Sequence, residues 1–248
     1  PHLSRYALLL PYSRSTAYSV FWEALADQAE ILNEVDRVHS LTVYRNIWPE
    51  RRDEQEFAKL IEDVRSHRLA GLIFASSPHG LTRSALMTEP DMPRVMIVSF
   101  PGPAPMPVVR NDLASWLDRA CGYLRHAGRK RVAVFGTRAG RMAAILDETA
   151  RGYGLHVPPQ WRLYMSHEWP LGVRHAAHLL MTLPAAERPE GLIITDDHLV
   201  DAVAKGLADA EVRVPDDLEV VSHVNYPAMP AGAKSMTRLG FRSEERRV

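Results

Sequence analysis

Polar side chains stand directly after two short apolar runs in the last quarter of the chain. Asp196 and Asp197 directly follow the apolar run Gly191–Thr195. Ser222–Asn225 stands at the end of the second run, Leu218–Ser222. Each run fits a strand that is buried on both faces of a parallel sheet, and a ligand of such a sheet binds beyond the carboxyl ends of its strands. Carboxylate, amide and hydroxyl groups gathered there would hydrogen-bond a small polar molecule.

Further polar and aromatic residues follow other apolar runs, so they should reach the same kind of sheet edge. Aromatic faces would cover the apolar side of a ligand, and charged or amide groups would fix its hydroxyl groups. The predicted ligand contacts are Ser13, Ser15, Tyr18, Ser76, Arg141, Trp169, Asp196 and Asn225.

Structural roles compete with this interpretation at several positions. Asp197 is better explained as the cap of the following helix, because its side-chain oxygens would accept from free N–H groups of the first turn. Ser13 and Ser15 fit capping of the first helix as well as they fit a ligand contact. Arg138 fits a solvated position equally well, and Asp112 is also interpreted as a cap.

Motifs of common catalytic centres are missing from the sequence. There is no G-x-S-x-G, no P-loop and no G-x-G-x-x-G after a strand. Gly136–Gly140 follows a strand and opens a helix, so its N–H groups offer an alternative site for a phosphate. His167 and Glu168 resemble an acid/base pair only by adjacency, and adjacent residues in an extended loop point apart. The sequence therefore predicts a binding protein and not an enzyme.

Eleven histidines raise the question of a bound metal. His175 and His178 share a helix face, and His198 follows Asp197 near a strand end, but neither H-E-x-x-H nor a cysteine pair is present. The expectation is that the chain holds no metal and no cofactor. The single cysteine, Cys121, lies on an apolar helix face, which predicts a buried and inert thiol.

An alternation of strands and helices must position these residues, and that alternation predicts an α/β fold with parallel, doubly wound sheets. The first half is expected to contain strands at Tyr6–Leu10, Ser40–Tyr44, Gly71–Ala75 and Arg94–Ser99, and helices at Tyr18–Asn33, Asp53–His67, around Leu81–Met87 and at Leu113–His126. The second half is expected to contain strands at Arg131–Phe135, Arg162–Tyr164, Gly191–Thr195 and Leu218–Ser222, and helices at Arg141–Tyr153, Leu171–Leu183 and after Asp197. The proline-rich stretch 101–107 is predicted to be a surface loop.

Composition agrees with a globular binding protein. The 248 residues are 46% hydrophobic and 24% charged, and 30 basic residues balance 30 acidic ones. This balance gives no broad basic field for nucleic acid. No run approaches the roughly 20 apolar residues of a membrane helix, and Ala7–Leu10 is too short for the core of a signal peptide. The tail 242–248 is interpreted as the start of a helix.

Three stretches of the chain are similar to the sequence motifs of one known protein family. Thr195–Asp197 with Arg213–Asp217 and Val220–Asn225 is similar to that family's strand ending in Asn-Asp, followed by a helix and "rVPdDvsVvgfDd". The segments 109–112 and 127–136 are similar to "Dn..ga..a..hL...GHrrIa.i.G", and 68–74 is similar to "r.vDGiIl". The three occur in family order and span nearly the whole chain. Together they resemble the LacI/GalR family of bacterial transcription regulators.

The resemblance implies a periplasmic-binding-protein-like fold of type I with two Rossmann-like lobes. The implied boundaries are 1–129 for the N-terminal lobe, 130–237 for the C-terminal lobe, and 238–248 for the start of a return to the first lobe. A small effector, such as a sugar, would bind in the cleft between the lobes, with Arg141 and Asp196 as contacts. The family also implies a cytoplasmic homodimer that binds operator DNA through a helix-turn-helix preceding residue 1. The alternative is a periplasmic solute-binding protein of the same fold.

One position departs from the family pattern. Val224 stands where the family often has an aspartate that binds sugar hydroxyls, and valine accepts no hydrogen bond. Three explanations remain open: Asn225 takes over, the ligand is not a standard sugar, or the site has lost affinity.

Overall fold

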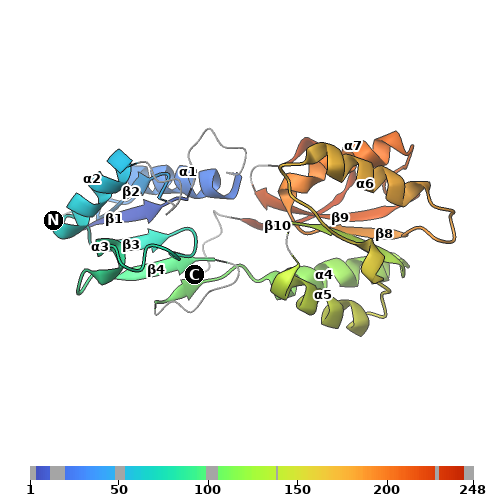
Figure 1. Cartoon of the computed structure of the whole chain (residues 1–248), viewed down its shortest axis with the longest axis horizontal. Helices are drawn as coiled ribbons and strands as arrows, with labels where there is room; N and C mark the ends of the chain where they lie inside the picture. The colour runs from blue at the N-terminus through green and yellow to red at the C-terminus, as the bar shows by residue number, and fades with distance from the viewer. Residues whose placement is uncertain are drawn as a thin grey trace. The chain divides into compact units, whose positions relative to one another are not determined.

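Two compact units make up the chain in the computed structural model, which describes residues 4–11, 20–47, 54–98, 106–137, 139–226 and 229–242. The first unit is drawn from Pro1–Asn111 and the second is Asp112–Arg242. Each contains one parallel five-stranded sheet with helices packed on it (Figure 1). The expected α/β architecture with two parallel sheets is therefore confirmed.

The first unit has the strand order β2-β1-β3-β4-β5. Its strands are β1 (Ser4–Leu9), β2 (His39–Tyr44), β3 (Gly71–Phe74), β4 (Arg94–Ile97) and β5 (Val108–Val109), and its helices are α1 (Val20–Val35), α2 (Glu54–Arg65) and α3 (Ala85–Thr88). Successive residues of a strand point to opposite faces, and β1 and the residue after it show the result. Leu8 and Leu10 pack with Ala26 of α1 on one face, while Ala7 and Leu9 pack with the α2 side on the other.

The second unit has the strand order β10-β9-β8-β6-β7. Its strands are β6 (Val132–Gly136), β7 (Arg162–Tyr164), β8 (Gly191–Ile194), β9 (Glu219–Tyr226) and β10 (Thr237–Arg242). Its helices are α4 (Leu113–His126), α5 (Gly140–Gly152), α6 (Pro170–Thr182) and α7 (Val200–Asp209), with short 3-10 turns η1 (Pro159–Trp161), η2 (Asp197–Leu199) and η3 (Ala231–Ser235). Helices α6 and α7 cover one face of the sheet, and α4 and α5 cover the other (Figure 1).

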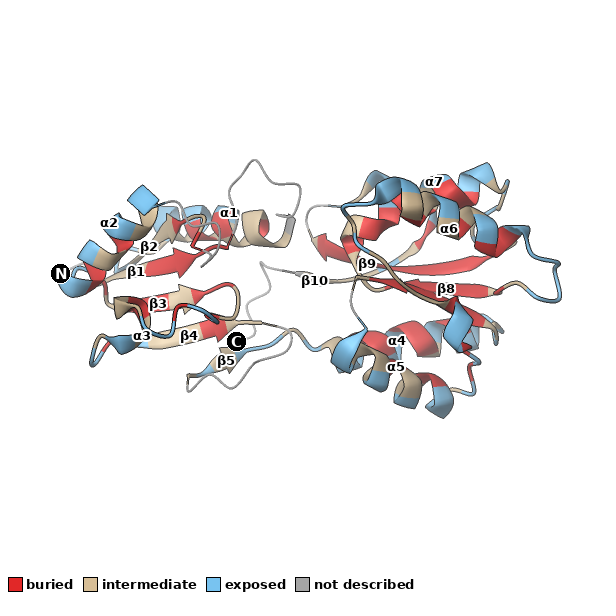
Figure 2. Ribbon diagram, viewed as in Figure 1, coloured by how far each residue is buried: buried red, intermediate tan, exposed pale blue. Residues whose placement is uncertain are grey.

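Burial follows the layering. The central strands β8 and β9 are buried along almost their whole length, while the helices beside them expose their outer faces (Figure 2). Helices α6 and α7 approach so closely that a Cβ added to Gly206 would lie 2.2 Å from the carbonyl oxygen of Arg174. Glycine at this position is therefore what lets the two helices pack.

The boundary between the units differs from the expected one at residues 129 and 130. Helix α4 was expected to close the first lobe, but its apolar face packs in the second unit. Trp116, Leu117 and Leu124 share a core cluster with Val132 and Val134 of β6. The helical period identifies the apolar face of α4 but does not say which sheet covers that face.

The end of the second unit also differs from expectation. Residues 238–242 were expected to begin a return to the first lobe, but they belong to β10, which pairs in parallel with β9 from Thr237–Val221 to Arg242–Tyr226. The strand therefore extends the second sheet. The predicted helical start at 242–248 lies, beyond Arg242, outside the described residues.

None of the helices in the described ranges is long and apolar enough to cross a membrane.

Candidate functional site

A cluster of polar side chains stands at the carboxyl ends of β6, β8 and β9 in the second unit. It comprises Thr137, Asp196, Asp197, His198 and Asn225, and is called the Asp196 cluster below. Thr137 Oγ1 donates to Asp196 Oδ2 over 2.6 Å, and Asn225 Nδ2 donates to Asp197 Oδ2 over 2.9 Å. The edge that the sequence predicted for ligand contacts thus does gather polar groups from three strands.

The local chain explains why these groups meet. Buried strand β8 ends at Ile194, and η2 begins three residues later, at Asp197, with Asp196 as its N-cap. Asp196 Oδ1 accepts from the backbone N–H of His198 over 3.1 Å, which satisfies a free donor at the start of the turn. Asp197 was expected to be the cap. Its side chain instead turns toward β9 and is held by Asn225.

His198 lies between the two carboxylates. Its Nδ1 is 2.8 Å from Asp196 Oδ1 and 3.4 Å from Asp197 Oδ1. Burial raises the pKa of Asp196, but the hydrogen bonds from His198 and Thr137 outweigh burial and bring that pKa down to about 2. Asp196 is therefore an anion at neutral pH, and because a carboxylate only accepts, Nδ1 of His198 carries a proton in this arrangement.

Two more histidines lie beside the cluster. The ring of His167 is 5.3 Å from that of His198 between centroids. His223 on β9 is only 9% exposed and packs against Trp116 and Phe241. Burial is the main cause that lowers the pKa of both His167 and His223, so both rings favour the neutral form.

The residues predicted as ligand contacts lie in different parts of the structure. Asp196 and Asn225 are brought together through Asp197 and His198. Arg141 is exposed in the first turn of α5, and Trp169, just before α6, is 72% exposed. Ser76 follows β3 in the first unit, where it is half-buried. Ser13, Ser15 and Tyr18 lie outside the described residues, as does Arg138.

Four residues in or beside the Asp196 cluster were not among the predicted ligand contacts. They are Thr137, His198, His167 and His223. A signal existed for two of them, because Thr137 directly follows an apolar run and His198 directly follows Asp197. His223 sits inside a buried run, where its neighbours indicate only a strand.

Two further expectations hold, both on helix α4. Asp112 caps the helix by accepting from Ser115 N over 3.0 Å, and Cys121 is buried, which raises its pKa to about 12.

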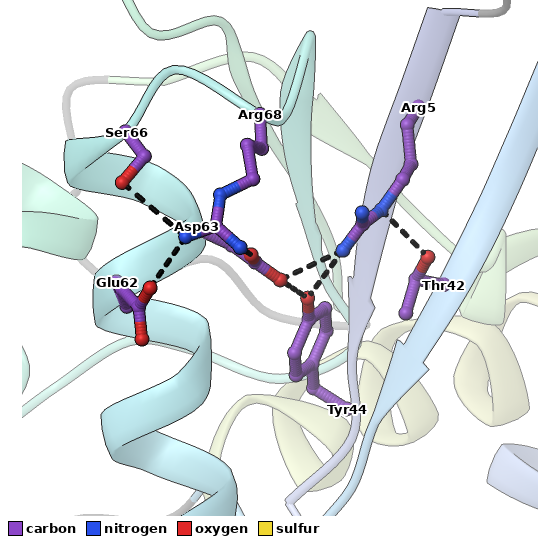
Figure 3. Close-up of polar contacts among 7 residues, drawn as sticks. All are labelled: Arg5, Thr42, Tyr44, Glu62, Asp63, Ser66 and Arg68. Atoms are coloured by element: carbon purple, nitrogen blue, oxygen red, sulfur yellow. Dashed lines mark hydrogen bonds and ion pairs between the residues drawn. The ribbon is translucent and has the colours of Figure 1, made fainter.

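A second polar cluster, in the first unit, is of a different kind (Figure 3). It comprises Arg5, Tyr44, Asp63 and Arg68, and is called the Asp63 cluster below. Arg5 Nη2 donates to Asp63 Oδ2 over 2.7 Å and to Tyr44 Oη over 3.1 Å. Tyr44 Oη also donates to Asp63, and Arg68 Nη1 lies 3.0 Å from Asp63 Oδ1.

The charge of Asp63 is fully matched by these partners. The carboxylate is 3% exposed, and burial alone would raise its pKa. The hydrogen bond from Tyr44 and the charges of Arg5 and Arg68 outweigh burial and lower that pKa. A buried carboxylate between two arginines holds α2 to β1 and β2, so this cluster is structural.

Comparisons with known proteins agree with the fold. Residues 121–240 match the family described as periplasmic binding protein-like domain. The ribose operon repressor of Escherichia coli K12 is 25% identical over 184 residues, which are 69% of this chain and 53% of the repressor. The chain thus spans about half the length of the curated relatives it matches.

Solved structures show the same fold. A putative ribose operon repressor from Burkholderia thailandensis is 18% identical with a TM-score of 0.64, and the match covers 96% of this chain and 97% of that one. A LacI family transcriptional regulator from Lactobacillus casei, solved with bound sucrose, is 19% identical with a TM-score of 0.61, covering 89% of this chain and 79% of that one.

The fold is that of a periplasmic-binding-protein-like domain of type I, and polar groups lie at the carboxyl edge of its second sheet. Within that class, the sequence is similar to the ribose operon repressor of Escherichia coli, and the fold is similar to that of solved LacI family regulators.

Proposed function

We propose that this chain is the ligand-sensing part of a DNA-binding transcription regulator. The observation that carries the proposal is the match to operon repressors over 184 residues, together with a polar cluster at the sheet edge where such folds bind ligands. The curated relatives are repressors, which favours regulation over solute transport. In this proposal the protein is cytoplasmic, assembles as a homodimer and reads operator DNA through a helix-turn-helix.

The proposed ligand is small, polar and rich in hydroxyl groups. The matched repressor is named for ribose, and L. casei regulators have been solved with glucose and sucrose. Asp196 is ionised and accepts hydrogen bonds, and Arg141, an exposed residue, carries a planar fork of donors. The exposed indole of Trp169 offers an apolar face. These three residues are the proposed contacts in the second unit, with Ser13, Ser15, Tyr18 and Ser76 as proposed contacts from the first.

A thermal-shift screen of pentoses, hexoses and disaccharides tests this proposal, because a ligand that binds only the folded state raises its apparent stability. Calorimetry with the best ligand then compares the wild type with Arg141→Ala, which should lose about 1.5–3 kcal/mol of binding free energy, the range for a charged hydrogen bond. Arg213→Ala is the matched control, because Arg213 is an exposed arginine that pairs with Asp217 away from the Asp196 cluster. Equal binding by all three proteins would show that the contacts are wrongly assigned, and no stabilisation by any sugar would contradict the ligand class.

A further inference from the structure

One oxygen from each of two carboxylates and one imidazole nitrogen converge in the Asp196 cluster. Asp196, Asp197 and His198 each offer one ligand atom, and these atoms lie within 4.8 Å of one another. His198 Nδ1 is 2.8 Å from Asp196 Oδ1 and 3.4 Å from Asp197 Oδ1. Two ligands that bind one ion at about 2.05 Å are about 2.9 Å apart at a right angle and about 3.3 Å apart at the tetrahedral angle. The two separations from His198 Nδ1 match those of neighbouring ligands around a common ion.

We propose that Asp196, Asp197 and His198 form a binding site for one divalent transition-metal ion of the Zn²⁺, Co²⁺ or Ni²⁺ class. The ion would replace the proton that Nδ1 of His198 now carries between the two carboxylates. A set of one imidazole and two carboxylates suits these ions, whereas Mg²⁺ and Ca²⁺ prefer oxygen ligands alone.

The outer oxygens of both carboxylates are already oriented. Thr137 Oγ1 holds Asp196 Oδ2, and Asn225 Nδ2 holds Asp197 Oδ2. Each bond leaves the Oδ1 atom of the same carboxylate turned toward His198. Hydrogen bonds of this kind fix the ligands of metal sites in proteins, and a capping role for Asp196 alone requires neither of them.

His223 points to a ligand independently of the three proposed metal ligands. Its side chain is more than nine-tenths buried, and in the described part of the chain its Nδ1 has no hydrogen-bond partner. It lies two residues before Asn225 on β9, so both side chains are on the same face of the sheet, and Asn225 contacts Asp197. The charges of Asp197 and Asp196 both act on the His223 ring. A buried ring nitrogen without a hydrogen-bond partner in the described residues thus lies within electrostatic range of both carboxylates.

Charge balance supports a cation. In the ranges that the structure describes, the hydrogen-bond and ion-pair partners of Asp196 and Asp197 are threonine, asparagine and histidine, with no lysine or arginine among them. Neighbouring carboxylates without a fixed cation are costly to bury, and a divalent ion would neutralise both.

The proposal shares its location with the proposed function but does not depend on it, because metal binding requires neither a sugar nor DNA. The test uses the whole purified chain after treatment with a chelator. Cobalt chloride is added while the visible spectrum is recorded, and zinc binding is measured by competition with a chromophoric chelator. We expect one equivalent of Co²⁺ to bind with a spectrum distinct from that of the hydrated ion.

Variants locate the ion. His198→Gln and Asp197→Asn should each weaken zinc binding at least about 30-fold, and Thr137→Val, which removes only an orienting bond, should weaken it about 10-fold. His175→Gln is the matched control, because His175 is an exposed histidine on α6 that shares a helix face with His178. Its binding should stay within about 2-fold of the wild type, a difference of at most about 0.4 kcal/mol.

Two outcomes overturn the proposal. One is a Co²⁺ spectrum identical to that of the hydrated ion with the wild type, a result that needs no variant to fold. The other is loss of the bound ion in His175→Gln but not in His198→Gln, which would place it on α6. A sugar that stabilises the chain while no metal binds would reject the metal site and leave the proposed function standing; one bound ion without any sugar response would do the reverse.

Discussion

The two units each bury a carboxylate cluster, and the clusters are balanced in opposite ways. Asp63 in the first unit accepts from Tyr44 and lies between Arg5 and Arg68, so one anion meets two permanent cations. Asp196 and Asp197 in the second unit meet one imidazole and two neutral donors. The first arrangement is complete within the chain, whereas the second has negative charge to spare. A complete cluster indicates a structural role, and an incomplete one at a sheet edge indicates a place for a partner.

The largest effect on the free energy of unfolding should come from removing the carboxylate of the Asp63 cluster. Asp63→Ala leaves Arg5 and the buried Tyr44 hydroxyl without their common acceptor, which should lower the free energy of unfolding by about 3 kcal/mol. Urea denaturation followed by circular dichroism measures this change. Glu62→Ala is the matched control, since Glu62 is the neighbouring residue and pairs with the same Arg68 while 69% exposed. If Glu62→Ala lowered the free energy of unfolding as much as Asp63→Ala does, the Asp63 carboxylate would have no special role in stability.

The next largest effect on stability should come from acid, which protonates Asp63 in the Asp63 cluster. The folded-state pKa of Asp63 is lowered from 3.8, so its contribution to stability is present above that value and is lost as pH falls through the lower folded-state pKa. Asp63→Asn removes this titration. The stability difference between wild type and Asp63→Asn should therefore be constant near neutral pH and shrink below about pH 4. Urea denaturation at a series of pH values measures it, and a gap that widens in acid would contradict the assignment.

The smallest effect on the free energy of unfolding should come from an Asp→Asn substitution in the Asp196 cluster. Asp197→Asn keeps an oxygen for Asn225 Nδ2 and reduces the repulsion between neighbouring carboxylates. In chelator-treated protein, its free energy of unfolding should therefore stay within about 1 kcal/mol of the wild type. Asp63→Asn, measured alongside, should lose more. If Asp197→Asn instead loses more than Asp63→Asn, the second cluster is the structural one.

Local patterns explain which parts of the fold were predictable. The run Gly191–Thr195 and the acidic pair after it indicate a buried strand and a capped turn, and both are present. Helix α4 was predicted with its observed bounds, and so was the cap at Asp112. These features depend on residues a few positions apart. The sheet that α4 covers depends on contacts with β6, which its own periodicity does not encode.

The site was harder to predict than the fold. The sequence placed Asp196 and Asn225 at the carboxyl ends of strands because both follow apolar runs. The direction of Asp197 depends instead on the turn η2, and its partner lies 28 residues away on β9. Strand β10 was missed because Thr237–Arg242 mixes two arginines and a glycine into a short strand. The Asp63 cluster joins Arg5 and Asp63 across 58 residues, and no local motif marks it.

The position of α4 also bears on how this protein could be recombined with others. Asp112 is both the first residue of the second unit and the residue whose carboxylate closes the start of α4. A crossover between genes at Asn111 would transfer the helix together with its own cap and with β6, against which Trp116 and Leu124 pack. A crossover at residue 129 would separate that helix from its sheet and leave apolar surface on both products. The junction best suited to exchanging the second unit between related proteins therefore lies at the cap of α4.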